Sequence, residues 1–363
     1  MKLPPIWVRR VILAPLVIII SLLMVVTIPL WLLGAIGLTA LVPGRFRLPR
    51  VLWLITVYLL WDSALLVFMF GLWVASGFGW RINSPAFRRA HYRLGARGLE
   101  ILFQIFGSVL RLSIETTGSD DPDPDPDAAT AAFEALFTPG KPLIVASRHA
   151  GPGDSFIIVH TLLNEVARMP RIVLKYTMQW DPAVDVLLNR IPTRFIVPTS
   201  FGGKKKGGGH SVEESLRDLA TGLGPDDAFV IFPEGGNVTS TRRRTRIDRL
   251  RSTGRDALAD RAESMLHVMP PQPGGMHAAL EASPDADVVF IGHTGLDRLI
   301  TMADIWRELP MDKGILMRAW RVPRSEIPED RDAQAEWLFG WFERIDGWIA
   351  ERTEVASPPT PES

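Results

Sequence analysis

The hydrophobic and polar positions divide the chain into an apolar first part and a longer part built from short alternating segments. Residues 11–42 include no charged side chain, and Asp62 is the only acidic or basic residue within 51–80. A helix of roughly 20 apolar residues spans a bilayer core. The many apolar side chains around Asp62 offset the cost of about 3 kcal/mol for one central carboxylate. We therefore predict a membrane-embedded helical region over residues 1–80.

Three basic clusters flank the two apolar stretches and bear on the membrane topology. The first is Lys2, Arg9 and Arg10, the middle one is Arg45, Arg47 and Arg50, and the third is Arg81, Arg88, Arg89, Arg93 and Arg97. Two crossings would place the middle cluster outside, against the positive-inside tendency, whereas re-entrant hairpins bent at Pro29 keep all three clusters on one side. The sequence allows both topologies. The basic cluster after Trp80 predicts that the downstream part of the chain lies on the cytoplasmic side of the cell membrane. A cleaved signal peptide is not expected, because its apolar region would be much shorter.

The next segment connects the apolar part to a more polar one. A basic amphipathic stretch over residues 81–107 predicts a helix near the lipid headgroups, and the alternation over 109–115 predicts a strand. We assign residues 81–113 to this interfacial helix and its connector. Residues 118–127, GSDDPDPDPD, are acidic and proline-rich and predict a solvated linker. The prolines and the missing loop glycine argue against a calcium-binding loop.

Beyond residue 130, short apolar runs alternate with amphipathic stretches. Predicted strands cover residues 143–146, 172–174, 194–197, 229–232 and 288–291, and predicted helices cover 155–168, 211–221, 242–265 and 275–281. A last helix over 332–352 carries a core-facing side made of Trp337, Trp341, Ile345 and Trp348. This alternation predicts an α/β fold over residues 114–352, with a mostly parallel sheet flanked by helices. Residues 353–363 are predicted to form a disordered tail.

Composition excludes several classes of function. The 40 basic and 40 acidic residues cancel, so no overall field favours nucleic acid as a partner. The absence of cysteine excludes disulfides, thiolate nucleophiles and cysteine-bound zinc. Apart from His149, the histidines, including His293, show no metal-ligand spacing and are assigned structural roles, so no metal site is predicted.

One candidate for chemistry follows the strand predicted over 143–146. In SRHAGPGDSF, residues 147–156, Gly151 and Gly153 allow the chain to fold back, so that Asp154 can reach the imidazole of His149. A carboxylate on one ring nitrogen fixes the tautomer and raises the basicity of the other, which can then take a proton from a substrate hydroxyl. The alternative is that His149 ends the strand and Asp154 caps the next helix.

A second candidate lies at the end of another buried strand. In FVIFPEGGN, residues 229–237, a glutamate follows the strand beside two glycines. Ligand sites of open α/β sheets form beyond the carboxyl ends of their strands. Flexible backbone at this edge allows close approach of a ligand, so the two segments are predicted to contribute to one site.

These blocks resemble those of the glycerophospholipid acyltransferase family, in the same order, over about residues 114–297. The family's His-x4-Asp block is matched by His149 and Asp154. Its Phe-Pro-Glu-Gly block is matched by Phe232, Pro233, Glu234 and Gly235. Residues 174–198 are similar to the block that helps to bind the acceptor phosphate, with Lys175 and Pro182 in matching places, and residues 286–295 are similar to the apolar fourth block.

The resemblance implies transfer of an acyl group from acyl-CoA or acyl carrier protein, as co-substrate and with no bound cofactor, to the hydroxyl of a lysophospholipid such as lysophosphatidic acid. His149 is then the general base, Asp154 orients it, and Glu234 with its neighbours shapes the acceptor pocket beside Lys175. Membrane lipids are the expected partners. The sequence indicates no oligomeric state.

The sequence departs from the family pattern where a phosphate is expected to bind. Gly236 and Asn237 replace a threonine and an arginine, the arginine that usually ends the second block is absent, and the fourth block lacks its proline. Candidate replacements are Arg242, Arg243 and Arg244, since guanidinium groups bind phosphate through paired hydrogen bonds. A solvated helix face explains these arginines equally well. The lysines of GGKKKGGG, residues 202–209, fit either phosphate or lipid binding or a solvated loop.

Two other functions fit part of the pattern. A catalytically degenerate, membrane-anchored lipid-binding factor would explain the missing arginine but not the retained His149, Asp154 and Glu234. A lipid or thioester hydrolase would ordinarily carry a serine within Gly-x-Ser-x-Gly, and the chain has no such motif.

Overall fold

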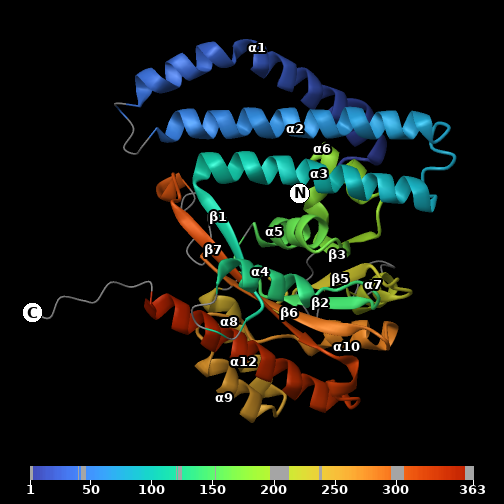
Figure 1. Cartoon of the computed structure of the whole chain (residues 1–363), viewed down its shortest axis with the longest axis vertical. Coiled ribbons are helices and arrows are strands. Elements are labelled where there is room, and N and C mark those ends of the chain that lie inside the picture. The colour runs from blue at the N-terminus through green and yellow to red at the C-terminus, as the bar shows by residue number, and fades with distance from the viewer. Residues whose placement is uncertain are drawn as a thin grey trace, which may run out of the picture. The chain divides into compact units, whose positions relative to one another are not determined.

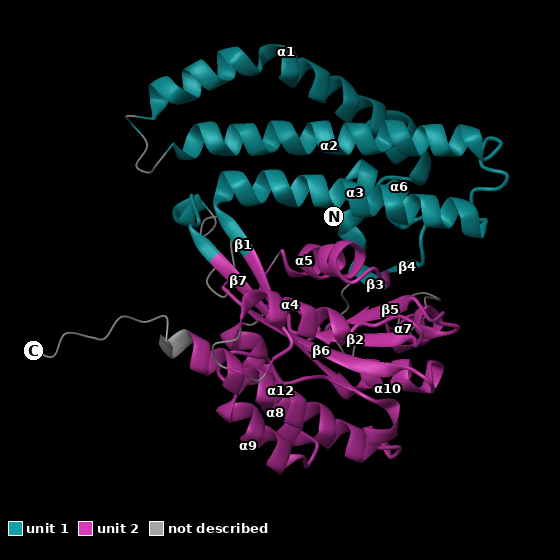
Figure 2. Cartoon of the chain, viewed as in Figure 1, with its two compact units in different colours: residues 1–113, 171–208, 303–313 teal, residues 114–170, 209–302, 314–363 magenta. Residues whose placement is uncertain are grey.

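The structure is a computed structural model, and it describes residues 3–39, 41, 46–119, 121, 125–151, 153–196, 212–236, 239–295 and 306–355. The chain divides into two compact units (Figure 2). Unit 1 comprises Met1–Ser113, Arg171–Gly208 and Ala303–Lys313, and unit 2 comprises Ile114–Pro170, Gly209–Met302 and Gly314–Ser363. The units therefore interleave along the chain, because two later segments join the N-terminal helices in unit 1.

Three long helices begin unit 1 (Figure 1). A π-helical turn, Val8–Leu13, leads into α1 (Ala14–Leu38), followed by α2 (Arg47–Ala75) and α3 (Pro85–Leu110). The helical spans Val8–Leu38 and Arg47–Ala75 are long and apolar enough to cross a membrane. Only 11% of the most apolar window in the first span and 28% in the second are buried. Length and composition thus point to membrane association of this part.

Buried polar contacts join these helices to a short helix from much later in the sequence. Helix α6 (Pro182–Leu188) follows the 3-10 turn Tyr176–Trp180, and neither was predicted. Asp62, 1% exposed within α2, accepts the N–H of Ala183 at 3.0 Å. Arg9 pairs with Asp185 at 2.9 Å. Burial of the Asp62 carboxylate is unfavourable by itself, and the hydrogen bond from Ala183 offsets part of this desolvation cost.

The sheet has seven strands in the order β1-β7-β6-β2-β5-β3-β4. The bounds are β1 Leu112–Thr117, β2 Leu143–Ser147, β3 Met169–Lys175, β4 Thr193–Ile196, β5 Asp227–Ile231, β6 Asp287–Thr294 and β7 Lys313–Val322. Strand β2 pairs in parallel with β5 and β6, and β3 pairs in parallel with β4. Strand β7, which was not predicted, runs antiparallel to β6. The mostly parallel α/β fold is confirmed.

The helices of unit 2 agree with the predicted pattern except in three places. Their bounds are α4 Pro126–Ala135, α5 Asp154–His160, a π-helical turn Thr161–Glu165, α7 Val212–Ala220, α8 Ser240–Ser252, α9 Asp256–Ser264, α10 Pro273–Ala282, a 3-10 turn Arg324–Glu326 and α12 Arg331–Val355. The predicted helix over 155–168 is shorter, because it changes to a π-helical turn at Thr161 and ends at Glu165. The predicted helix over 242–265 is two helices, because the chain turns at Gly254 with φ +73°. The predicted linker ends earlier than expected, since Asp125 caps α4 through the N–H groups of residues 127 and 128.

The last helix packs as the sequence pattern predicted. Trp341 of α12 stacks on Phe290 of β6 with ring centroids 4.7 Å apart, and Trp348 is 4% exposed. Stacked and edge-on aromatic pairs add to the stabilisation from buried area. The tryptophan side of α12 is therefore core, not a membrane face.

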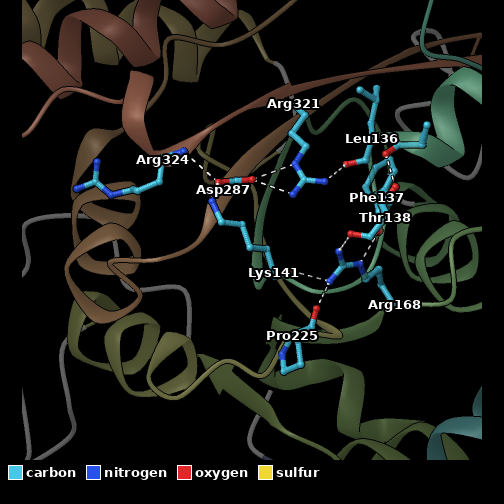
Figure 3. A network of polar contacts seen from close by, with 10 residues as sticks. Leu136, Phe137, Thr138, Lys141, Arg168, Pro225, Asp287, Arg321 and Arg324 are labelled. Carbon is cyan, nitrogen blue, oxygen red and sulfur yellow. Dashed lines mark hydrogen bonds and ion pairs between the residues drawn. The ribbon is translucent and has the colours of Figure 1, made fainter.

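A buried guanidinium organises the edge of the sheet where β2, β3 and β5 begin. Arg168, 0% exposed, donates to the carbonyl oxygens of Phe137 at 2.7 Å, Thr138 at 2.5 Å, Lys141 at 2.9 Å and Pro225 at 2.5 Å (Figure 3). Beside it, Asp287 at the start of β6 accepts hydrogen bonds whose donors are Lys141, Arg321 and the backbone of Arg324. This network leaves the opposite edge, where the strands end, for the candidate chemistry.

Candidate active site

His149 lies two residues beyond the end of β2, and Asp154 is the first residue of α5. His149 Nδ1 lies 3.1 Å from Asp154 Oδ2, and the N–H of Gly151 donates to the same oxygen at 2.7 Å. The predicted contact is confirmed. The capping alternative is not, because Gly153 is the N-cap of α5 and the helix has no side-chain cap. The Asp154 side chain is fully buried, whereas that of His149 is 22% exposed.

The surroundings of Asp154 keep it ionised. Burial alone would raise its pKa, but the hydrogen bond from His149, the charge of His293 and the N–H of Gly151 outweigh burial and lower the pKa of Asp154. An ionised carboxylate accepts a hydrogen bond from Nδ1–H of His149, and this tautomer leaves the lone pair on Nε2. The pair is thus arranged to accept a proton at Nε2.

Glu234 follows β5 and joins the second block to the first. Its side chain is 0% exposed, and its carboxylate accepts the N–H of His149 at 3.0 Å and the N–H of Met269 at 3.3 Å. The ring of Phe232 lies 4.9 Å from that of His149. The two blocks therefore meet as predicted, but the carboxylate of Glu234 holds the backbone of His149 and does not line an open pocket.

The rest of the second block forms a turn with unusual backbone. The carbonyl of Pro233 accepts the N–H of Gln272 at 2.9 Å. Gly235 has φ +60° and Gly236 has φ +146°, conformations that favour glycine. A side chain at 236 would also be obstructed, because a Cβ there would lie 2.6 Å from Nη1 of Arg242. Glycine at this position makes room for that guanidinium.

The three predicted phosphate-binding arginines have different surroundings. Arg242 lies over the turn at Gly236, and Arg244 is exposed on α8. Arg243 instead donates to the carbonyl oxygens of Ala262 at 3.1 Å and Glu263 at 2.6 Å, near the end of α9. Its guanidinium therefore stabilises the end of a helix, and the structure does not support the prediction of a phosphate ligand at Arg243.

The prediction for Lys175 stays a prediction. Lys175 is exposed at the end of β3 and belongs to unit 1, whereas His149, Asp154 and Glu234 belong to unit 2. The lysines of 202–209, and Asn237, lie outside the described residues.

Sequence reasoning missed two residues of the site. Arg148, 2% exposed, donates to the carbonyl oxygens of His293 at 2.5 Å and His267 at 2.9 Å. His293, also 2% exposed, places Nε2 at 3.7 Å from Asp154 Oδ2. The available signal was a histidine close to the carboxyl end of each of two parallel strands, His149 after β2 and His293 in β6. It could be used only once β6 was known to lie beside β2.

Burial also makes Glu234 sensitive to pH. Burial raises its pKa from 4.5 to about 7, against the charge of Arg148 and the N–H groups of His149 and Met269. The folded state then binds the Glu234 proton more tightly than the unfolded state, so folding stability falls as pH rises from about 4.5 to about 7. The change amounts to about 3 kcal/mol.

The variant Glu234→Gln has no such proton, so its free energy of unfolding is expected to lack this fall. Denaturant unfolding of both proteins at pH 5, 6, 7 and 8 measures the difference. We expect the free energy of unfolding of wild type, relative to the variant, to fall from pH 5 to pH 7 and to level off by pH 8. Parallel stability curves would contradict the raised pKa.

A family model matches the segment that carries this site. Residues 130–294 match a family model described as Acyltransferase, and this segment contains His149, Asp154, Glu234 and His293. Searches of curated proteins and of solved structures found no match. The family match identifies residues 130–294 as acyltransferase-like and supports acyl transfer to a lipid in general terms.

Proposed function

We propose that this protein transfers a fatty acyl group from acyl-CoA or acyl carrier protein to the hydroxyl of a lysophospholipid similar to lysophosphatidic acid. The observation that carries the proposal is the contact of His149 Nδ1 with the buried carboxylate of Asp154 at the carboxyl edge of the sheet. The partly exposed ring of His149 can meet a substrate, whereas Asp154 cannot. The contact of His149 with Asp154 and the family match both support acyl transfer.

In the proposed reaction, Nε2 of His149 takes the proton of the acceptor hydroxyl while the hydroxyl oxygen attacks the thioester carbonyl carbon. An ester C–O bond forms, the C–S bond breaks, and the thiolate takes the proton back from the imidazolium. The charge of Asp154 stabilises the imidazolium between these steps. The substrate supplies the nucleophile, so the protein needs no serine or cysteine.

The apolar helices suit a lipid acceptor. Both acceptor and product of this reaction belong to a membrane, and anchored helices would spare the enzyme the cost of extracting a lipid into water. We assign the protein to the cell membrane with unit 2 on the cytoplasmic side, on the basis of the basic residues after Trp80. Membrane lipids and the acyl donor are its proposed partners.

The proposal is tested with the purified full chain, radiolabelled acyl-CoA or acyl carrier protein, and a panel of lysolipids. We expect labelled diacyl product with at least one acceptor. Release of free fatty acid faster than transfer would identify a hydrolase. Lipid binding without any labelled product would identify a binding factor.

The acceptor phosphate is proposed to bind Arg242. Its guanidinium lies over Gly236, next to the turn that follows Glu234, and it is exposed. A hydrogen bond to a charged group contributes about 1.5–3 kcal/mol, which corresponds to about 10-fold to 100-fold in KM. We expect Arg242→Ala to raise KM for lysophosphatidic acid by this factor and to leave KM for monoacylglycerol, which lacks the phosphate, unchanged.

Arg249→Ala is the matched control, since it removes an exposed arginine further along the same helix that is not among the candidate phosphate ligands. It is expected to leave both KM values within about twofold. Gly236→Ala is expected to reproduce the Arg242→Ala result, because its Cβ would displace the guanidinium. Equal losses with both acceptors, or in both arginine variants, would contradict the assignment.

A further inference from the structure

Two imidazoles that come from different strands lie close to the carboxylate of Asp154. His149 extends from the end of β2, and His293 is the penultimate residue of β6. The strands are parallel, with Ser147 opposite Ile291, so both histidines lie two residues beyond one register pair. Asp154 Oδ2 is 3.1 Å from Nδ1 of His149 and 3.7 Å from Nε2 of His293.

The two imidazoles differ in exposure. The His149 side chain is 22% exposed and can meet a substrate, whereas that of His293 is 3% exposed. A buried imidazole next to a buried carboxylate cannot take a proton directly from a lipid alcohol. It can, however, donate an N–H toward that carboxylate from the protein interior.

The backbone of His293 is held in place from the same strand that carries His149. The guanidinium of Arg148, 2% exposed, donates to the carbonyl oxygen of His293 at 2.5 Å. The N–H of Arg148 also donates to the carbonyl of Ile291 at 3.2 Å. One residue thus links the ends of β2 and β6, which holds the backbone that carries the second imidazole.

We propose that His293 is a positioning residue of the acyl-transfer site: its Nε2–H, close to the carboxylate of Asp154, acts as a second donor beside His149. Asp154 Oδ1 makes no hydrogen bond to any residue in the described part of the chain. A small rotation of the carboxylate would let Oδ1 accept the N–H of His293 while Oδ2 keeps His149 and Gly151. The carboxylate would then stay aligned with the imidazole that gains a proton during the reaction.

This inference rests on the proposed function, and its test compares variants of His293 in the full chain. His293→Leu removes the N–H, whereas His293→Gln places an amide N–H close to the position of Nε2. We expect His293→Leu to lower kcat by about 10-fold to 100-fold, less than the loss expected for a general base. KM for donor and acceptor should stay within about twofold. His293→Gln should retain kcat within about threefold.

The matched control is His277→Leu, the same substitution at a half-buried histidine of α10 in the same unit. It is expected to leave kcat unchanged. If His293→Leu does not fold, His293→Gln and His293→Asn are compared instead, because the shorter amide does not reach the position of Nε2. Equal kcat values for the glutamine and leucine variants, or for the glutamine and asparagine variants, would overturn the proposal.

A spectroscopic readout separates this inference from the proposed function. In ¹⁵N-histidine-labelled protein, the Nδ1–H of His149 bound to Asp154 is expected to give a low-field proton signal. That signal should shift in His293→Leu and persist in His293→Gln. An unchanged signal in His293→Leu would overturn the positioning role. If wild type transfers no acyl group, the proposed function fails, but the signal still tests the contact.

Discussion

Replacing His149 with alanine is expected to lower acyl transfer by about 10² to 10⁴-fold, the contribution of a general base. The expected loss corresponds to about 3–5 kcal/mol of transition-state stabilisation. The fold should be unaffected, because the contact that His149 makes with Glu234 uses its backbone N–H, which alanine retains. Initial rates with purified protein and labelled acyl-CoA, at saturating acceptor, measure the effect.

His160→Ala is a suitable control for His149→Ala, since it removes a histidine of α5 whose ring bonds Asn164 and lies 4.0 Å from Glu165, both within its own helical segment. Its kcat is expected to lie within about threefold of wild type, because His160 has no role in the proposed proton transfer. Normal acyl transfer by a folded His149→Ala protein would remove the general-base assignment.

The largest effect on stability is expected from Arg168→Met. This change keeps most of the aliphatic length but removes the donor to four carbonyl groups, a buried one at Phe137 and partly buried ones at Thr138, Lys141 and Pro225 (Figure 3). Hydrogen bonds from charged donors are worth about 1.5–3 kcal/mol each, and buried acceptors left unpaired carry a desolvation penalty. We expect a loss of about 3–5 kcal/mol in the free energy of unfolding, comparable to breaking a buried ion pair.

Denaturant unfolding of the full chain at constant detergent concentration measures this loss. Lys141→Met provides the comparison, because Lys141 contributes a half-exposed ion pair with Asp287 to the same network. A small effect of about 1 kcal/mol is expected, because the Lys141 ammonium is half-exposed and Arg321 still pairs with the buried Asp287 in the variant. Similar losses in the two variants would show that the buried guanidinium has no special role in joining the starts of the strands.

The predicted part of the site depended on local sequence. The contact of Asp154 with His149 followed from five positions of chain and two glycines, because short segments have few ways to fold back. The approach of Glu234 to the same edge followed from a general property of parallel sheets. What Glu234 touches was not predicted, because a spacing does not say whether a carboxylate faces a cavity or a backbone N–H.

Helix and strand predictions failed where a local pattern was weak or was interrupted. Strand β7 and helix α6 were missed, since neither stands out from its surroundings by periodicity. The break between α8 and α9 was missed because an isolated glycine is tolerated within a helix, and only φ +73° at Gly254 shows that the helix ends.

The sequence by itself determined the apolar helices, the α/β alternation and the His149–Asp154 pair, because each depends on residues close together along the chain. Only the tertiary structure decided the partners of Asp62, Arg168 and His293. Each of these buried polar groups contacts residues far away in sequence, and a buried polar group must be paired to be stable. The need for a partner can be read from the sequence, but its identity depends on which strands and helices become neighbours.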